Sequence, residues 1–307
     1  MNERGGQRKK IGCLIFIVII IFFLWRLPFV PKKTTVISPI PETPKPQQQS
    51  VFSFFQRKKN PSDLADKINA AIDSAWNDYS VYVEDYTTDF SVGLSETEIF
   101  TAASVNKVPI LAALYYYAQN GTIDLDRDIT LQASEIQHYG TGSLRYAEPG
   151  TVYSIKTLAR LMIKQSDNTA AFILANEIVG LNKIQSLIQQ WGLTQTDMIN
   201  NKTSNKDIAV LFRKIYEEKI VNHAFTQEIL SFLKDTDFET RLPAHLPENV
   251  TVYHKIGTET GSIHDAGIVT DSQHTYYIGV FTNDETDDAE SEKLIAKISK
   301  VVYDYLR

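Results

Sequence analysis

Strand-like segments lie at both ends of the globular part of this chain, and a long helical stretch separates them. Alternating apolar residues predict a hairpin around Val81, Val83 and residues 90–94, and further strands over 251–256, 267–270 and 276–281. Helical periodicity covers roughly residues 104–219. Strands from opposite chain ends are expected to share one sheet. The pattern therefore predicts an α/β (α+β) fold, with an antiparallel sheet flanked by terminal helices beside an all-helical lobe.

The two terminal helices each show an apolar face. The first is expected from Pro61, with Asn60 or Ser62 as its cap, and its face is Leu64, Ile68, Ile72 and Trp76. The last carries the stripe Leu294, Ile295, Ile298, Val301, Val302 and Tyr305. We therefore divide residues 61–307 into an α/β lobe, 61–103 and 219–307, and a helical lobe, 104–218.

An apolar run over residues 11–25 follows Arg4, Arg8, Lys9 and Lys10. Its length fits both a membrane-spanning helix of about 20 residues and a cleaved signal core of about 7 to 15. No small-x-small cleavage site follows, which favours a transmembrane anchor over residues 1–30 with its amino end in the cytoplasm. Proline-rich residues 31–60 predict an extracytoplasmic linker. Either reading places residues 61–307 outside the cytoplasm.

The globular region is strongly acidic. Residues 1–60 hold eleven of the 31 Lys and Arg but only two of the 37 Asp and Glu. The remaining 20 bases and 35 acids leave residues 61–307 with a formal charge of roughly −15. Such a surface repels nucleic acid and anionic lipid, so the substrate is expected in a pocket. The single cysteine, Cys13, lies in the apolar run, so no disulfide is expected in the exported domain.

Three short motifs carry the chemistry. Ser104 and Lys107 stand three residues apart at a predicted helix start, Ser-Asp-Asn at 166–168 follows a helical segment, and Lys-Ile-Gly at 255–257 lies in a predicted strand. A serine hydroxyl becomes a nucleophile when a base takes its proton, and a lysine serves if burial or a second cation lowers its pKa. We expect the Lys107 amine to reach the Ser104 hydroxyl, and Lys255 to be the second cation.

Each motif also has a structural explanation. Ser231 and Lys234 repeat the first spacing inside an ordinary amphipathic helix, so that spacing is weak evidence alone. Ser, Asp and Asn all favour helix caps, and a cap at 166–168 is compatible with a catalytic role. Lys255 alone would be an exposed strand lysine. The order of the three motifs is what indicates a reaction centre.

With these motifs the chain resembles the class A β-lactamases of the serine penicillin-recognising family. The likeness covers residues 61–307 and includes Phe-Thr-Ala-Ala before Ser104, Ser-Asp-Asn-Thr-Ala at 166–170 and Asp-Ala-Gly-Ile-Val at 265–269. The resemblance implies a serine β-lactamase/DD-peptidase-like fold. It also implies that Ser104 is the acylated nucleophile, that Lys107 is its base or proton relay, and that Ser166 passes a proton to the leaving nitrogen.

The resemblance further implies a substrate-binding set. Asn168 would hold the amide side chain of the substrate, and Lys255 would supply positive potential for its carboxylate. Backbone N–H groups of Ser104 and Thr258, the latter next to Gly257, would form the oxyanion hole. No cofactor is implied, and the six histidines lack the spacing of a metal site.

Two positions depart from the family pattern. Ile256 replaces a Thr or Ser, so Thr258 or Thr260 would have to supply the missing hydroxyl to the carboxylate. The loop that usually carries a deacylating Glu corresponds to residues 192–206, where Asp197 is the only carboxylate. Asp197 is either a substitute base or a solvated loop residue. Without an aimed base, water attack on the acyl-enzyme should be slow.

Three activities follow from these observations. The first is a β-lactamase-like hydrolase that opens β-lactam rings through a Ser104 acyl-enzyme. The second is an acyl-transfer enzyme on D-alanyl-D-alanine ends of cell-wall peptides, which the missing Glu and the anchor favour. The third is a non-enzymatic module that binds β-lactams or the cell wall. A small-molecule β-lactam or D-alanyl peptide is the expected partner in each case, and the membrane is the partner of the N-terminal helix.

Overall fold

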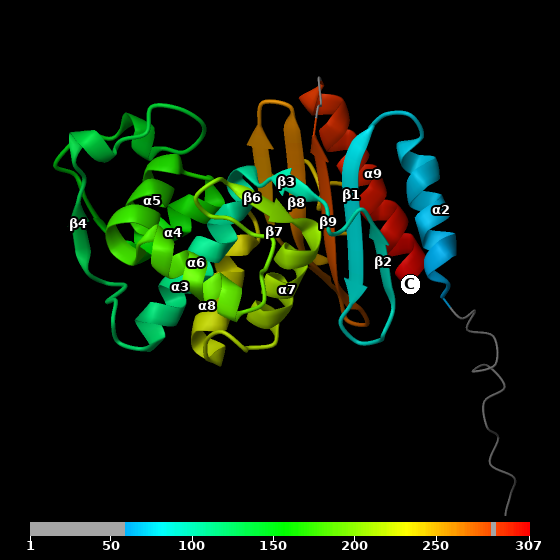
Figure 1. Cartoon of the computed structure of the whole chain (residues 1–307), viewed down its shortest axis with the longest axis horizontal. Coiled ribbons are helices and arrows are strands. Elements are labelled where there is room, and N and C mark those ends of the chain that lie inside the picture. Colours follow the sequence, from blue (N-terminus) through cyan, green and yellow to red (C-terminus); the bar gives the residue numbers. More distant parts are fainter. Residues whose placement is uncertain (1–58, 284–286) are drawn as a thin grey trace, which may run out of the picture. The chain divides into compact units, whose positions relative to one another are not determined.

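A computed structural model describes residues 59–283 and 287–307 (Figure 1). The predicted anchor and all but the end of the predicted linker lie outside these residues. Within them, none of the helices combines the length and the apolar character needed to cross a membrane.

Five strands form one antiparallel sheet in the order β2-β1-β9-β8-β7. They are β1 (Asp78–Asp85), β2 (Ser91–Leu94), β7 (Thr251–Glu259), β8 (Ser262–Thr270) and β9 (Thr275–Asn283). The β1 and β9 strands pair across the middle of the sheet, with Val81 opposite Val280. Strands from the two chain ends therefore share one sheet, and the predicted fold class is confirmed.

The strand β8 begins five residues earlier than predicted. Its first half contains His264 and Asp265, whose polar side chains interrupt the apolar alternation. Both side chains are fully buried. Their polar groups are satisfied by neighbours in the folded chain, which a local pattern does not reveal.

The two faces of the sheet are covered by different helices. Helices α2 (Pro61–Ile72) and α9 (Asp288–Leu306) contact each other and pack in one core with Ile278 and Val280. Helix α7 (Asn205–Tyr216) contacts β1, β8 and β9 and shares the other core with Tyr277 and Phe281. Successive side chains of a strand point to opposite faces, so β9 contributes to both cores.

The first helix is shorter than predicted. Its cap is Asn60, whose side chain accepts a hydrogen bond from the Ser62 N–H at 3.2 Å. The helix ends at Ile72, and the following residue, Asp73, has a φ of 51°. Trp76, predicted on its apolar face, lies beyond this end. The indole is nevertheless buried and donates to Ser291 Oγ at 3.3 Å.

A second group of helices lies beside the sheet and shares one core: α3 (Lys107–Gln119), α4 (Ile155–Lys164), α5 (Asn168–Phe172), the π-helix η5 (Ile173–Val179), α6 (Leu181–Gln190) and α8 (His223–Leu233). The last of these contacts α3 and α4, although the predicted lobe boundary at 218 separates them. Two three-residue strand pairs were not predicted: β3 (Ile99–Thr101) with β6 (Lys202–Ser204), and β4 (Asp128–Thr130) with β5 (Val152–Ser154). Three residues are too few to show an alternating pattern.

Candidate active site

The candidate nucleophile Ser104 lies in a short 3-10 helix, η2 (Ala103–Asn106), which leads directly into α3. The preceding residue, Ala103, has a φ of 47°, in the left-handed region that L-residues rarely adopt. Ser104 is half-buried. Strained backbone next to a half-buried hydroxyl is typical of functional sites.

Lys107 is the first residue of α3, and its side chain is almost entirely buried, with 6% exposed. The Nζ atom donates to Ser166 Oγ at 3.1 Å, to the Ser166 carbonyl oxygen at 2.5 Å and to Asn168 Oδ1 at 2.7 Å. The expected hydrogen bond to Ser104 is not among those of the described residues. Burial lowers the pKa of Lys107 to about 7, although the negative charge of Asp167 opposes the shift.

Ser166 is the meeting point of the three motifs. Its Oγ atom accepts hydrogen bonds from Lys107 and from Lys255, whose Nζ lies 3.0 Å away. Lys255 also donates to the Ile256 carbonyl oxygen at 3.0 Å. Burial, and then the charge of Lys107, lowers the pKa of Lys255 well below its ordinary value. A hydroxyl that accepts from two amines keeps its own proton free to donate elsewhere.

The Ser-Asp-Asn motif divides structural and site roles among its residues. Asp167 caps α5 by accepting from the Ala170 N–H at 2.9 Å, and it also accepts from the Leu144 N–H at 2.8 Å. Ser166 has a φ of 53°, which turns its hydroxyl toward the lysines rather than into the helix. Asn168 uses its Oδ1 for Lys107 and donates from Nδ2 to the Tyr139 carbonyl oxygen at 3.3 Å.

The strand β7 lies against η2 because residue 257 has no side chain. A Cβ atom at Gly257 would stand 3.1 Å from the Ala102 carbonyl oxygen, 3.1 Å from Val105 Cγ2 and 3.2 Å from His264 Cδ2. Such distances are shorter than ordinary van der Waals contacts. Glycine therefore lets the strand that carries Lys255 run beside the helix that carries Ser104.

Arg241 is a site residue that the sequence did not reveal. Its buried guanidinium donates from one nitrogen to the carbonyl oxygens of Gly257 and His264, at 2.9 and 2.7 Å, and from the other to Thr258 Oγ1 at 2.7 Å. It also pairs with Glu292 at 3.0 Å. Ile256 is buried and has no hydroxyl. The hydroxyl near this end of β7 is that of Thr258, and Arg241 lies beside it. Arg241 lies in a loop without any periodic pattern.

Thr141 was also missed. Its Oγ1 donates to the Ser166 carbonyl oxygen at 3.1 Å, the oxygen that also accepts from Lys107. The residue comes from the loop between η3 (Ala133–Glu135) and η4 (Leu144–Tyr146). No signal in the sequence relates this loop to Ser166.

The carboxylate of Asp197 accepts hydrogen bonds from residues of its own turn. It accepts from the N–H groups of Ile199 and Asn200, both at 2.9 Å, and from Asn200 Nδ2 at 2.7 Å. These hydrogen bonds, chiefly those from Asn200, lower the pKa of Asp197. Its oxygens are occupied by a local turn, and a less basic carboxylate is a weaker proton acceptor. The geometry therefore favours a structural role for Asp197 in its loop over the role of a substitute base.

Histidines near the site have partners inside the protein. His264 Nδ1 accepts from the Thr282 N–H at 3.2 Å, and its Nε2 donates to the Thr101 carbonyl oxygen at 2.7 Å. Burial lowers the pKa of His264 to about 4, so the ring is neutral.

Among the residues that the structure describes, no three His, Cys, Asp or Glu side chains form a group that would hold a metal ion.

Comparisons with known proteins agree with this geometry. A β-lactamase from Bacteroides uniformis is 28% identical over 240 residues, which cover 68% of this chain and 79% of that protein. The solved structure of PBP-A is 28% identical with a TM-score of 0.74 and covers 80% of this chain and 96% of that one. The acyl-enzyme complex of a PBP-A mutant with penicillin G is 26% identical, with a TM-score of 0.74 and coverage of 80% and 96%.

The model of one protein family, described as the Beta-lactamase enzyme family, matches residues 63–306. The match takes in η2, Ser166 and β7, so it includes all three motifs as well as the sheet and the helices. The fold expected from the resemblance is present, and residues of the three motifs lie close together in it. The family model matches nearly all of the described chain, and on this ground the protein belongs to the Beta-lactamase enzyme family.

Proposed function

We propose that the protein is a serine hydrolase that opens β-lactam rings through an acyl-enzyme on Ser104. The observation that carries the proposal is the convergence of Lys107 and Lys255 on Ser166 Oγ, at 3.1 and 3.0 Å, beside the helix that bears Ser104. In the first step Ser104 Oγ bonds to the lactam carbonyl carbon while neutral Lys107 takes its proton. A lysine with a pKa of about 7 is neutral in a large fraction of molecules at neutral pH.

The second step breaks the carbon–nitrogen bond of the ring. The electron pair of that bond goes to the nitrogen, which takes a proton from the Ser166 hydroxyl. Lys107 returns the proton to Ser166, with which it is already hydrogen-bonded. Backbone N–H groups of Ser104 and Thr258 hold the carbonyl oxygen while it carries negative charge. Atoms and charges balance, and Ser104 is left as an ester.

The Lys255 amine and the Thr258 hydroxyl serve the carboxylate of the substrate. Lys255 lies in β7, and Thr258 is an exposed residue of the same strand. All five N–H groups of Arg241 donate inside the protein, and one of them donates to Thr258 Oγ1. The Thr258 hydroxyl therefore accepts from Arg241 and keeps its own proton for the carboxylate. Arg241 thereby orients the hydroxyl that replaces the one missing at Ile256.

Slow hydrolysis of the ester is the second part of the proposal. The loop 192–206 has no Glu, and the Asp197 carboxylate is occupied by its own turn. This observation favours a long-lived acyl-enzyme, as in an enzyme that transfers acyl groups from D-alanyl-D-alanine ends. The solved acyl-enzyme complex of a PBP-A mutant with penicillin G, 26% identical to this chain, supports a long-lived ester.

Residues 1–30 are proposed as a transmembrane anchor and 31–60 as a linker that places residues 61–307 outside the cytoplasm. Support comes from the apolar run 11–25, the basic residues before it and the prolines after it. Protease protection of membrane vesicles that carry the full chain tests this topology. The globular region should be cleaved only from the extracytoplasmic side.

Mass spectrometry of the intact protein with penicillin G tests the nucleophile. We expect a mass increase of one penicillin on the wild type, none on Ser104→Ala, and a normal adduct on Ser231→Ala. Ser231 is the matched control because it is the serine of the second Ser-x-x-Lys spacing and lies on the exposed face of α8. A wild type with neither adduct nor turnover contradicts the proposal.

The fate of the adduct separates the two activities. A chromogenic cephalosporin should give a burst of one equivalent followed by slow turnover. Rapid multiple turnovers would contradict slow deacylation and leave an efficient β-lactamase. Release of D-alanine from an acyl-D-alanyl-D-alanine peptide would identify the acyl-transfer activity. A burst without peptide cleavage would identify a β-lactam-binding module.

A further inference from the structure

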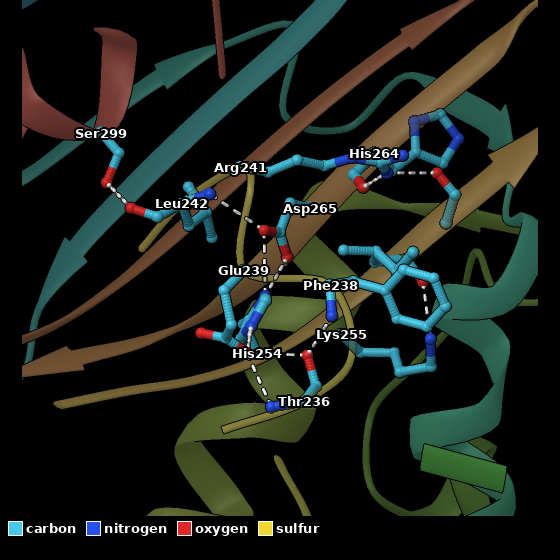
Figure 2. Close-up of polar contacts among 12 residues, drawn as sticks. Thr236, Phe238, Glu239, Arg241, Leu242, His254, Lys255, His264, Asp265 and Ser299 are labelled. Atoms are coloured by element: carbon cyan, nitrogen blue, oxygen red, sulfur yellow. Dashed lines mark hydrogen bonds and ion pairs between the residues drawn. The ribbon is translucent and has the colours of Figure 1, made fainter. Parts of the chain in front are cut away.

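A buried histidine lies one residue before Lys255 and contacts two carboxylates. His254 is 0% exposed; its Nδ1 lies 2.9 and 3.0 Å from the two oxygens of Asp265, and its Nε2 lies 3.2 Å from Glu239 Oε1 (Figure 2). A neutral imidazole has only one N–H, so its other nitrogen would set a lone pair against an oxygen. Both nitrogens therefore donate, and the ring is an imidazolium.

The electrostatics of the cluster agree with a charged ring. Burial alone would lower the pKa of His254, but the charge and hydrogen bond of Asp265, followed by those of Glu239, raise it to about 9. Burial alone would raise the pKa of Glu239, but the hydrogen bond and charge of His254, with the hydrogen bonds of Thr236, lower it. His254 is thus the reverse of His264, whose pKa burial lowers to about 4.

The cluster holds both ends of the segment that carries Arg241. At one end, His254 Nε2 binds the Glu239 side chain, which also accepts from the Thr236 N–H at 2.6 Å. At the other end, Asp265 Oδ2 accepts from the Leu242 N–H at 3.1 Å. Arg241 lies between these anchor points in the chain, and Figure 2 shows its side chain reaching along the sheet toward His264.

We propose that His254, together with Asp265, is a positioning residue that holds Arg241 on Thr258 and thereby sets the affinity of the site for the substrate carboxylate. His254 touches no reacting atom in this proposal. It acts through residues 239–242, since these are the residues that the imidazolium and Asp265 bind. The inference rests on the proposed function for its substrate.

The other charged groups around His254 have partners of their own. Lys255 donates to Ser166, and Arg241 is paired with Glu292. The Lys164 ammonium, on α4, donates to the carbonyl oxygens of Lys234 and Asp235. Glu239 is 42% exposed, so solvent reaches the cluster from its side.

The test is a comparison of acylation by penicillin G in the full-length protein, with apparent affinity and acylation rate constant measured separately. His254→Gln should weaken apparent affinity about tenfold, the effect of one lost hydrogen bond between charged groups, with the rate constant nearly unchanged. Affinity of the wild type should fall as pH rises through about 9, and His254→Gln should lack this fall. His223→Gln is the matched control, since His223 pairs with Glu218 at 2.6 Å on an exposed surface. The control should match the wild type.

A double-mutant cycle shows whether the effect passes through Arg241. His254→Gln in an Arg241→Gln background should weaken affinity no further, because the contact that it positions is already absent. An additive loss, or an unchanged affinity in a folded His254→Gln variant, would overturn the proposal. If His254→Gln does not fold, Glu239→Gln takes its place, with an expected loss of about threefold because it removes the exposed partner of the imidazolium. Unchanged affinity there would equally overturn it.

Hydrogen exchange gives a readout that needs no substrate. Residues 236–243 should exchange faster in His254→Gln than in the wild type at the same pH, and His223→Gln should leave them unchanged. If the wild type forms no penicillin adduct, the proposed function fails while this measurement still decides whether His254 holds the segment. Equal exchange in both proteins contradicts the positioning role alone.

Discussion

Lys255 Nζ lies 3.0 Å from Ser166 Oγ, although 89 positions separate the two residues in the chain. The contact joins the edge strand β7 to the turn before α5. It brings a lysine amine from the sheet to a hydroxyl from the helices, to which Lys107 also donates. The proposed proton transfer through Ser166 depends on this contact between the two parts of the fold.

Lys255→Met should slow acylation of Ser104 by a chromogenic cephalosporin about 10- to 100-fold, because it removes a hydrogen bond of a type worth about 1.5–3 kcal/mol when one partner is charged. The methionine keeps most of the buried volume, so the melting temperature should change little. Stopped-flow acylation with a chromogenic cephalosporin measures the rate. A variant that acylates as fast as the wild type would exclude Lys255 from the proton network.

Acylation should accelerate with rising pH and reach half of its maximum near the Lys107 pKa of about 7. The sign follows from the chemistry, since only the neutral amine accepts the Ser104 proton and the neutral fraction grows above this pKa. Lys107→Met should lose about 10²-fold or more in rate and lose this pH dependence. Lys234→Met is the matched control, because Lys234 ends the second Ser-x-x-Lys spacing and is exposed. Its profile should equal that of the wild type.

Asp197→Asn should leave the deacylation rate within about twofold of the wild type. A general base accelerates such a step about 10²- to 10⁴-fold, and a carboxylate that does not act as the base provides none of this acceleration. An asparagine retains an oxygen that accepts from the N–H groups of Ile199 and Asn200. The measurement is the decay of the acyl-enzyme by mass spectrometry after excess penicillin is removed. A drop of more than tenfold with an intact fold would restore Asp197 as the substitute base.

Gly257→Ala should impair acylation more than it impairs folding. The added Cβ would meet the Ala102 carbonyl oxygen at 3.1 Å, so β7 must move away from η2, at a cost of about 1–3 kcal/mol. Gly93→Ala is the control, because its Cβ would meet only the end of the flexible Glu96 side chain. Thermal unfolding and stopped-flow acylation should separate the two variants. Equal acylation rates would show that the spacing between β7 and η2 is not critical.

Several features of this protein can be predicted from short stretches of its chain. Apolar periodicity predicts α9 and the central parts of the strands, and the Asn60 cap of α2 is encoded within three residues. The proposed roles of Ser104, Lys107 and Ser166 follow from residue type and order. The elements and the cap are local features, because apolar periodicity and helix caps depend first on near neighbours in the sequence.

The folded chain alone decided the rest. Whether Lys107 binds Ser104 or Ser166, whether Asp197 faces the ester or its own turn, and where Arg241 lies are all set by contacts across long stretches of chain. Burial depends on the same contacts, so the contrast between a charged His254 and a neutral His264 is invisible in the sequence. Long-range contacts arise from packing of the whole chain, and no local pattern records them.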